Sequence, residues 1–303
     1  MIYGIDIGGS KIEIAVYDEG INLQDSWRVN TPTGDYQTFL DTLTTLIIEA
    51  DQRFDCLGKI GLGMAGLIDK NNLSLSANIA VANGKDIAKD VGDIVGRHIT
   101  CENDCRCFAL SEANGGAGVG YSTVYGAIIG TGAAGGFVID RKLLKSWQNI
   151  AGEYGHLQLS AVLSQKYNLP LRKCGCGLAS CYEGYISGPG LQFLHKHFND
   201  VDLSVLDLLN SWRDGDKAAI STIDCYLDLL GACLSNIVLS YDPDIIVLGG
   251  GISLIDEFVT AIPQKIENHL FKGYRAPPVV TAKFGDASGT RGAALLARGA
   301  ANA

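Results

Sequence analysis

A β-rich run that ends in a glycine turn occurs twice in this 303-residue sequence and constrains its fold more than any other feature. Residues 3–8 read YGIDIG and residues 125–130 read YGAIIG. After the first turn, Ile12, Ile14 and Val16 alternate with polar or small residues, which predicts a returning strand. The repeat indicates two related α/β halves, with chance similarity over six residues as the alternative.

The rest of the chain alternates strand-like and helix-like patterns. Hydrophobic periodicity predicts further strands at residues 23–29, 59–64, 99–102, 245–248 and 279–283. It predicts helices at residues 35–54, 87–97, 216–240, 254–270 and 289–300, and a helix that follows residue 104. This alternation predicts an α/β fold in which parallel sheets dominate.

Composition excludes several classes of protein. The chain has 24 Lys and Arg against 33 Asp and Glu, a formal charge of −9, and 47% hydrophobic residues. We therefore expect neither nucleic acid nor a membrane as its partner, since phosphate groups need clustered cations. Residues 1–20 look like strands rather than a signal peptide, and no apolar run reaches membrane length. We expect a cytoplasmic protein in which the nine cysteines stay reduced.

Three glycine clusters follow predicted strands. They contain Gly8, Gly9, Ser10 and Lys11; Gly130, Thr131 and Gly132; and Gly249, Gly250 and Gly251. Such turns let backbone N–H groups approach phosphate oxygens, although each could equally be a plain hairpin turn. None fits the P-loop or the Rossmann signature. The neighbouring Asp6 and the hydroxyls of Ser10 and Thr131 favour a site for a nucleotide and Mg²⁺.

Asn103 and Asp104 stand where a short predicted strand becomes a helix. Open α/β sheets bind ligands at the carboxyl ends of their strands, so Asp104 is a candidate general base that takes a proton from a hydroxyl. The alternative is an N-cap, in which the carboxylate only accepts a backbone hydrogen bond.

His156, Cys174, Cys176 and Cys181 form the most distinctive group. Three thiolates and one imidazole make the closed four-ligand set that structural zinc prefers, and the alternative is reduced thiols beside a core histidine. The other six cysteines are interpreted as packing residues. Two carboxylates near this group, Glu153 and Glu183, could receive sugar hydroxyls or be solvated surface residues.

These residues together resemble the ROK family of sugar kinases and repressors. The resemblance rests on residues 6–11, 130–136 and 153–156, on Cys174-Gly-Cys176-Gly, and on Cys181-Tyr-Glu183, and it extends over essentially the whole chain. It implies two actin-like (ribonuclease-H-like) α/β domains with a cleft between them. The smaller domain would comprise residues 1–113 and about 288–303, and the larger domain residues 114–287.

The resemblance also implies an activity, the ATP-dependent 6-phosphorylation of N-acetyl-D-glucosamine, with glucose or N-acetylmannosamine as alternative substrates. It implies Asp104 as base and Asn103, Asp104, Glu153, His156 and Glu183 as sugar ligands. ATP and Mg²⁺ would lie against the first two glycine clusters with Asp6 near the metal, Gly249 and Gly250 would lie near the adenosine, and the zinc would be structural. The partners would be sugar and ATP, and a homodimer is compatible with the resemblance.

Some positions depart from the family pattern. Ala65, Ala133, Ala134 and Ser180 replace residues that the family pattern would have as Pro or Gly. Ala65 lies in a sugar-side loop, and Ala133 and Ala134 lie in the second phosphate turn, where the backbone could approach less closely. The resemblance implies intact phosphate chemistry and leaves sugar specificity the less certain part. The family also includes sugar-sensing repressors. We do not expect that role here, because the first predicted strand begins at Ile2 and the chain is acidic.

Overall fold

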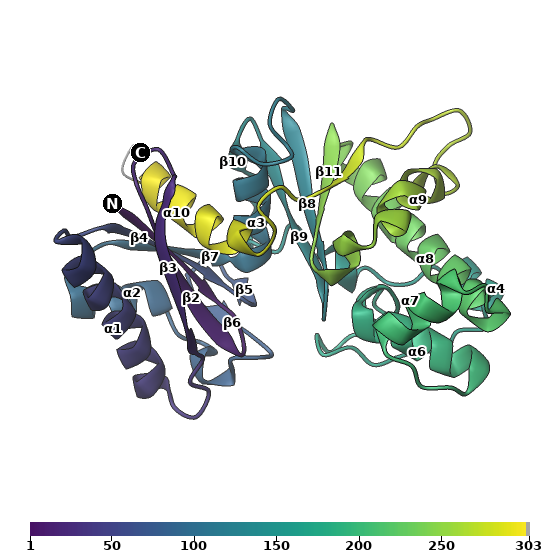
Figure 1. The fold of residues 1–303 in the computed structure, drawn as a ribbon, viewed down its shortest axis with the longest axis horizontal. Helices are drawn as coiled ribbons and strands as arrows, with labels where there is room; N and C mark the ends of the chain where they lie inside the picture. The colour runs from purple at the N-terminus through teal and green to yellow at the C-terminus, as the bar shows by residue number, and fades with distance from the viewer. Residues whose placement is uncertain (301–303) are drawn as a thin grey trace. The chain divides into compact units, whose positions relative to one another are not determined.

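The computed structural model describes residues 1–300, and the chain forms two compact units (Figure 1). Unit 1 contains Met1–Val119, Gly136–Ala151 and the described residues from Phe284 onward, and unit 2 contains Gly120–Gly135 and Gly152–Lys283. The domain limits expected from the sequence, 1–113 with 288–303 and 114–287, stay a prediction. Residues 301–303 of that expectation lie outside the described residues.

Unit 1 is built on a five-stranded sheet with the order β3-β2-β1-β4-β7. Its strands are β1 (Ile2–Ile7), β2 (Lys11–Tyr17), β3 (Leu23–Asn30), β4 (Lys59–Met64) and β7 (Ile99–Asn103). The first three strands form the antiparallel meander that the first glycine turn predicts, while β1, β4 and β7 run parallel. The sheet is therefore mixed, and parallel pairing is confined to one half of it. A short hairpin, β5 (Leu67–Ile68) and β6 (Ser74–Leu75), follows β4.

Four helices belong to unit 1. They are α1 (Tyr36–Phe54), α2 (Ile87–Val95), α3 (Asp104–Ala113) and α10 (Ser288–Ala300). Helix α10 lies unusually close to the sheet, because a Cβ at Gly4 would stand 1.8 Å from the carbonyl oxygen of Thr290 and one at Gly61 would stand 1.9 Å from that of Ala293. Glycine at both positions is thus a condition for packing α10 here.

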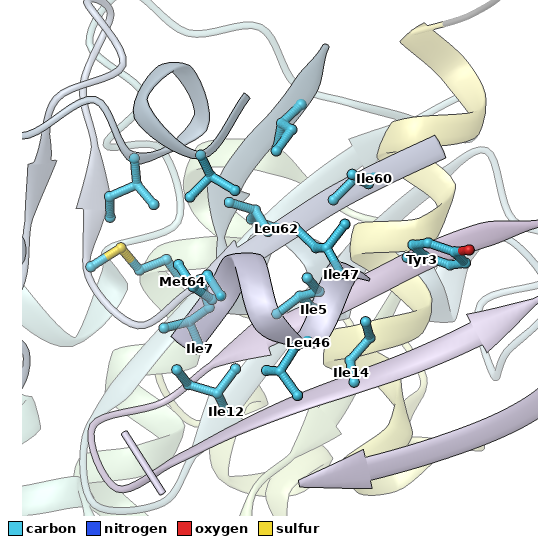
Figure 2. Packing of buried hydrophobic residues seen from close by; sticks show 14 of the residues in the cluster. Tyr3, Ile5, Ile7, Ile12, Ile14, Leu46, Ile47, Ile60, Leu62 and Met64 are labelled. Atoms are coloured by element: carbon cyan, nitrogen blue, oxygen red, sulfur yellow. The ribbon is translucent and has the colours of Figure 1, made fainter. Parts of the chain in front are cut away.

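The opposite face of this sheet carries the main core of unit 1 (Figure 2). Alternate residues of β1 and β2, among them Ile5, Ile7 and Ile12, point into it together with Leu46 and Ile47 of α1. All of them are buried, as the period-two pattern of the strands and the helical pattern of residues 35–54 predict. Burial of this cluster leaves the other face of β1, which includes Asp6, for the side of α10.

The second sheet has the order β10-β9-β8-β11-β12. Its strands are β8 (Thr123–Ile129), β9 (Ala133–Ile139), β10 (Lys142–Leu143), β11 (Ile245–Gly249) and β12 (Val279–Thr281). Strand β11 runs parallel to both β8 and β12. The strand predicted at residues 279–283 is shorter than expected and ends at Thr281.

The helices of unit 2 follow β10 and surround the long central helix. They are α4 (Ala161–Lys166), α5 (Glu183–Ile186), α6 (Gly188–Asn199), α7 (Val205–Arg213), α8 (Lys217–Tyr241) and α9 (Asp256–Glu267). Helix α9 begins later than predicted, because a 3₁₀ turn at Gly251–Leu254 precedes it. Among the described helices, α8 alone has the length and apolar composition of a membrane span, but 83% of its most apolar window is buried inside the protein. It is a core helix.

All nine cysteines lie within the described residues, and no disulfide joins any of them there. Cys105, Cys107, Cys225 and Cys233 are buried, as their interpretation as packing residues requires. Cys56 and Cys101 are only partly buried, so they fit the interpretation as packing residues less well. Cys56 belongs to the turn after α1, where its carbonyl oxygen accepts a hydrogen bond from Tyr3 Oη at 3.1 Å.

Candidate active site

Asp6 and Asp104 lie at the same edge of the unit 1 sheet. In the parallel ladder Asp6 is paired with Gly63, and Gly63 is paired with Glu102. Asp104 begins α3 two residues beyond Glu102, at the carboxyl ends of the strands. Gly63 lets the first turn of α3 pack close to β4, since a Cβ there would stand 3.2 Å from Cys107 Sγ and 3.8 Å from the Cα of Asp104. This edge is where an α/β sheet binds its ligands.

Burial makes both carboxyl groups unusually basic. Desolvation, followed by the charge of Asp104, raises the pKa of Asp6 to about 7. Desolvation also raises the pKa of Asp104 to about 6, against hydrogen bonds from the backbone N–H of Cys105 at 2.8 Å and from Asn103 Nδ2 at 3.0 Å. A basic, partly buried carboxylate beside a second one is suited both to proton transfer and to a cation.

Asn103 is buried and its side chain is largely engaged by the protein itself. Its Oδ1 caps α3 by accepting a hydrogen bond from the N–H of Arg106 at 3.0 Å. Its Nδ2 donates to the carbonyl oxygen of Gly66 at 2.8 Å and to Asp104 Oδ1 at 3.0 Å. The N-cap that the sequence offered as an alternative for Asp104 therefore belongs to Asn103. The carboxylate of Asp104 lies one residue further, inside the first turn.

The first glycine cluster is a tight hairpin turn between β1 and β2. The N–H of Gly8 donates to the carbonyl oxygen of Lys11 at 3.0 Å, and the side chains of Ser10 and Lys11 are exposed. A Cβ at Gly9 would stand 2.7 Å from the Cβ of Asn78. The turn is therefore a hairpin turn in which Asn78 packs against Gly9, and its role as a phosphate loop stays a prediction.

The second and third glycine clusters lie beside each other in unit 2. Strands β8 and β11 are parallel neighbours, and Gly249 is paired with Ile128. Gly250 has a φ of 78°, and a Cβ there would stand 2.5 Å from the carbonyl oxygen of Ile129 and 3.1 Å from the N of Gly130. Thr131 is exposed in the turn closed by the Gly130 N–H, which donates to the carbonyl oxygen of Gly132 at 2.9 Å. Two clusters that are far apart in the sequence form one glycine surface.

The predicted zinc ligands come together. The candidate ligand atoms of His156, Cys174, Cys176 and Cys181 all lie within 4.8 Å of one another. Cys176 Sγ and Cys181 Sγ are 3.6 Å apart, and Cys174 Sγ is 3.6 Å from His156 Nδ1. With Zn–S and Zn–N bonds of about 2.3 and 2.0 Å, a tetrahedron has edges of about 3.5 to 3.8 Å. The donor set therefore fits a zinc ion.

The two carboxylates near this cluster contact it from different sides. Glu153 Oε2 lies 3.7 Å from His156 Nε2, the ring nitrogen that faces away from Cys174. Glu183 Oε1 lies 3.8 Å from Cys174 Sγ. Both side chains are partly buried, so neither is a freely solvated surface residue. A zinc loop that includes His156 would thus orient both carboxylates.

Two groups of the predicted residues are therefore assembled. In unit 1 the structure brings together Asp6 and the head of α3. In unit 2 it brings together the glycine surface, both glutamates and the thiol cluster, which consists of His156, Cys174, Cys176 and Cys181. Sequence reasoning missed Glu102 and Arg106, a buried ion pair with a separation of 3.1 Å beside Asp104. Nothing in their spacing distinguished Glu102 from a solvated strand residue or Arg106 from a solvated helix residue.

The described geometry agrees with comparison to known proteins. Residues 2–300 match the ROK family. The chain belongs to the ROK family. It is 45% identical over 299 residues to the N-acetylgalactosamine kinase of Shewanella sp. (strain ANA-3), covering 99% of this chain and 97% of that protein. It is 40% identical over 299 residues to the N-acetyl-D-glucosamine kinase of Salmonella heidelberg (strain SL476), covering 98% and 99%.

Solved structures of the family share its fold. The ROK hexokinase of Thermus thermophilus has a TM-score of 0.88 at 28% identity, and the alignment covers 99% of each chain. The ROK family glucokinase of Streptomyces griseus, crystallised with glucose and AMPPNP, has a TM-score of 0.79 at 27% identity over 98% of this chain and 99% of that one. The predicted actin-like α/β class is confirmed.

Proposed function

We propose that this ROK protein transfers the γ-phosphoryl group of ATP to the 6-hydroxyl of an N-acetylated hexosamine, with N-acetyl-D-glucosamine as the first candidate substrate. The observation that carries the proposal is the partly buried Asp104 at the head of α3, on the sheet edge that also holds Asp6. Kinases of N-acetyl-D-glucosamine and N-acetylgalactosamine at 40% and 45% identity over nearly the full chain support it.

Asp104 acts as the general base. Its carboxylate accepts the proton of the sugar hydroxyl while that oxygen attacks the γ-phosphorus, and the bond from the γ-phosphorus to the bridging oxygen of ADP breaks. A pKa of about 6 leaves Asp104 ionised at neutral pH and more basic than an exposed aspartate. Asn103 holds this carboxylate through its Nδ2.

ATP and Mg²⁺ are assigned to the glycine turns. Gly8, Gly9, Ser10 and Lys11 of unit 1, and Gly130, Thr131, Gly132, Gly249 and Gly250 of unit 2, are the proposed nucleotide-binding residues. The partly buried carboxyl of Asp6, with its raised pKa, fits a position near a divalent cation. Bound Mg²⁺ supplies positive charge to the phosphate oxygens.

The sugar is assigned to Asn103, Asp104, Glu153, His156 and Glu183. Carboxylates accept hydrogen bonds from vicinal hydroxyls, and both glutamates lie against the thiol cluster, which keeps their positions fixed. Zinc on His156 Nδ1, Cys174, Cys176 and Cys181 has a structural role. We also propose that the enzyme is cytoplasmic, and a homodimer remains compatible with the proposal.

N-Acetylgalactosamine is the second candidate substrate, because the relative that is 45% identical acts on it. The two amino sugars differ only in the configuration of the 4-hydroxyl. Coupled ADP release with N-acetylglucosamine, N-acetylgalactosamine, N-acetylmannosamine and glucose, compared by kcat/KM, tests the proposal. We expect the highest value with one of the first two sugars. A preference for glucose would reject the hexosamine assignment, and sugar-independent ATP hydrolysis alone would reject the kinase itself.

A further inference from the structure

We propose that Arg106 is a positioning residue that clamps the loop between Leu144 and Ala151 onto the helix that carries Asp104, and thereby fixes the start of the segment with Glu153 and His156. Arg106 lies in the first turn of α3, two residues after Asp104, and is only 3% exposed. A buried arginine must be paired on most of its donors, so its partners show what it does.

The partners of Arg106 stand at both ends of one loop. Nη2 donates to the carbonyl oxygen of Leu144 at 3.2 Å, and Nη1 donates to the carbonyl oxygen of Ala151 at 3.2 Å. Nε lies 3.1 Å from Glu102 Oε1, in an ion pair without a directed hydrogen bond. The planar fork of a guanidinium can reach two carbonyls at once, whereas a lysine ammonium is a single point charge.

The loop has little else to hold it. Residues 145–150 lie outside helices and strands, and within the described chain we find no hydrogen bond from any of them. Trp147 is 80% exposed, and the ammonium of Lys70 lies 4.8 Å from its ring centre. The Oγ of Ser146 is buried without a partner. Arg106 is therefore the main polar anchor of the loop.

The chain continues directly from the clamp into the proposed sugar ligands. Ala151 precedes Gly152, whose φ of 117° only glycine adopts readily. The carbonyl oxygen of Gly152 accepts hydrogen bonds from the N–H groups of Gly135 and Tyr154, each at 2.8 Å. Glu153 and His156 follow within one 3₁₀ turn. Arg106 thus holds Ala151, the residue from which the chain continues to two proposed sugar ligands.

This inference rests on the proposed function, and kinetics test the two together. For Arg106→Lys we expect the KM for the sugar to rise about tenfold, with kcat within about threefold and the KM for ATP unchanged. Arg291→Lys is the matched control. Arg291 donates to the carbonyl oxygens of Ser111 and Asn114 at the other end of α3. The Arg291→Lys variant should therefore have a lower folding stability and an unchanged KM for the sugar. Equal sugar KM values in the two variants would overturn the proposal.

Limited proteolysis tests the clamp without any sugar. Lys145 is exposed inside the loop, so trypsin should cut after it at least about fivefold faster in Arg106→Lys than in the wild type and Arg291→Lys, with the site identified by mass spectrometry. Unchanged cleavage would reject the clamp. If the wild type phosphorylates no sugar, the proposed function fails and cleavage still reports on Arg106.

A second variant covers the case in which Arg106→Lys does not fold. Arg106→Met combined with Glu102→Gln removes the buried ion pair as a unit, so neither charge stays unpaired. We expect the same faster cleavage after Lys145 and the same higher sugar KM. A folded double variant that matches the wild type in both measurements would overturn the proposal.

Discussion

Glu183 accepts a hydrogen bond from the backbone N–H of Ala133 at 3.0 Å, and its second oxygen lies 3.8 Å from Cys174 Sγ. Gly132 makes this approach feasible, since a Cβ there would stand 2.8 Å from Glu183 Oε2. One carboxylate therefore joins the thiol cluster to the second glycine turn. A substitution in the thiol cluster should therefore alter the position of the second glycine turn, which we assign to the phosphates of ATP.

Removing one thiol should release the metal. We expect Cys174→Ala to lose about one zinc per chain and to raise KM for both sugar and ATP, because Glu183 loses its support. Elemental analysis and kinetics check this. Cys225→Ala, which removes a buried thiol of α8 outside the cluster, is the control and should keep its zinc. Absence of zinc from the purified wild type would end the metal assignment.

Neutralising the proposed base should separate binding from turnover. Asp104→Asn keeps the shape of the side chain but cannot accept the proton, so kcat should fall about 10²- to 10⁴-fold. Sugar binding measured by calorimetry should stay within about tenfold of the wild type, because the other sugar ligands remain. An unchanged kcat would remove Asp104 from the mechanism.

The same group sets the expected pH dependence. A base works only when deprotonated, and burial raises the pKa of Asp104 to about 6. We therefore expect kcat/KM to be constant above about pH 7 and to fall about tenfold per unit below about pH 6. Initial rates at saturating ATP and Mg²⁺ measure the profile. A profile that stays flat down to pH 5 would show that Asp104 has an ordinary pKa or is not the base.

Local patterns predict much of this fold. The alternation of Ile12, Ile14 and Val16 marks strand β2, and the three glycine clusters do end strands. The thiol cluster can also be predicted from sequence, because the types and spacing of its four residues indicate a metal site without knowledge of the packing. Boundaries are harder to predict from sequence: α9 begins at Asp256 rather than at residue 254, after a 3₁₀ turn at Gly251–Leu254, and ends at Glu267 rather than at residue 270.

Contacts that depend on strand register and tertiary packing cannot be predicted from such local patterns. The placement of Asp6 beside the head of α3 depends on a ladder through Gly63, which no local pattern encodes. The sequence predicts Asn103 as a sugar ligand but does not show that its side chain also caps α3 and donates a hydrogen bond to the carbonyl oxygen of Gly66. Arg106 looks like a solvated helix residue until its loop partners are known.

Replacing Asp6 by a neutral residue should raise the folding stability of the protein in the absence of ATP, Mg²⁺ and sugar. Burial and the charge of Asp104 raise its pKa to about 7 from the usual 3.8, so the folded state loses stability as pH rises between these values. Asp6→Asn should therefore be more stable by about 1 to 3 kcal/mol at pH 8, with a smaller gain at pH 5, while activity falls. Thermal unfolding at both pH values measures it. A lower melting temperature at pH 8 would contradict the argument.

Asp228 should show the opposite behaviour, because its charge is paired. It is buried on α8 and accepts hydrogen bonds from Lys166 Nζ and Tyr167 Oη at 2.7 Å and from His269 Nε2 at 2.8 Å. Burial raises its pKa, but these bonds outweigh burial and hold it at about 2. The stabilisation is complete above about pH 4 and is lost as pH falls towards 2.

Asp228→Asn should accordingly destabilise the protein by about 2 to 3 kcal/mol at pH 7, measured by urea unfolding. The control is Asp224→Asn on the same helix, where an exposed carboxylate lies 3.8 Å from Lys265 Nζ. That substitution should change stability by less than about 0.5 kcal/mol, since exposed ion pairs contribute little. Equal effects at the two positions would mean that burial and multiple hydrogen bonds do not distinguish Asp228, and that its pKa is not lowered.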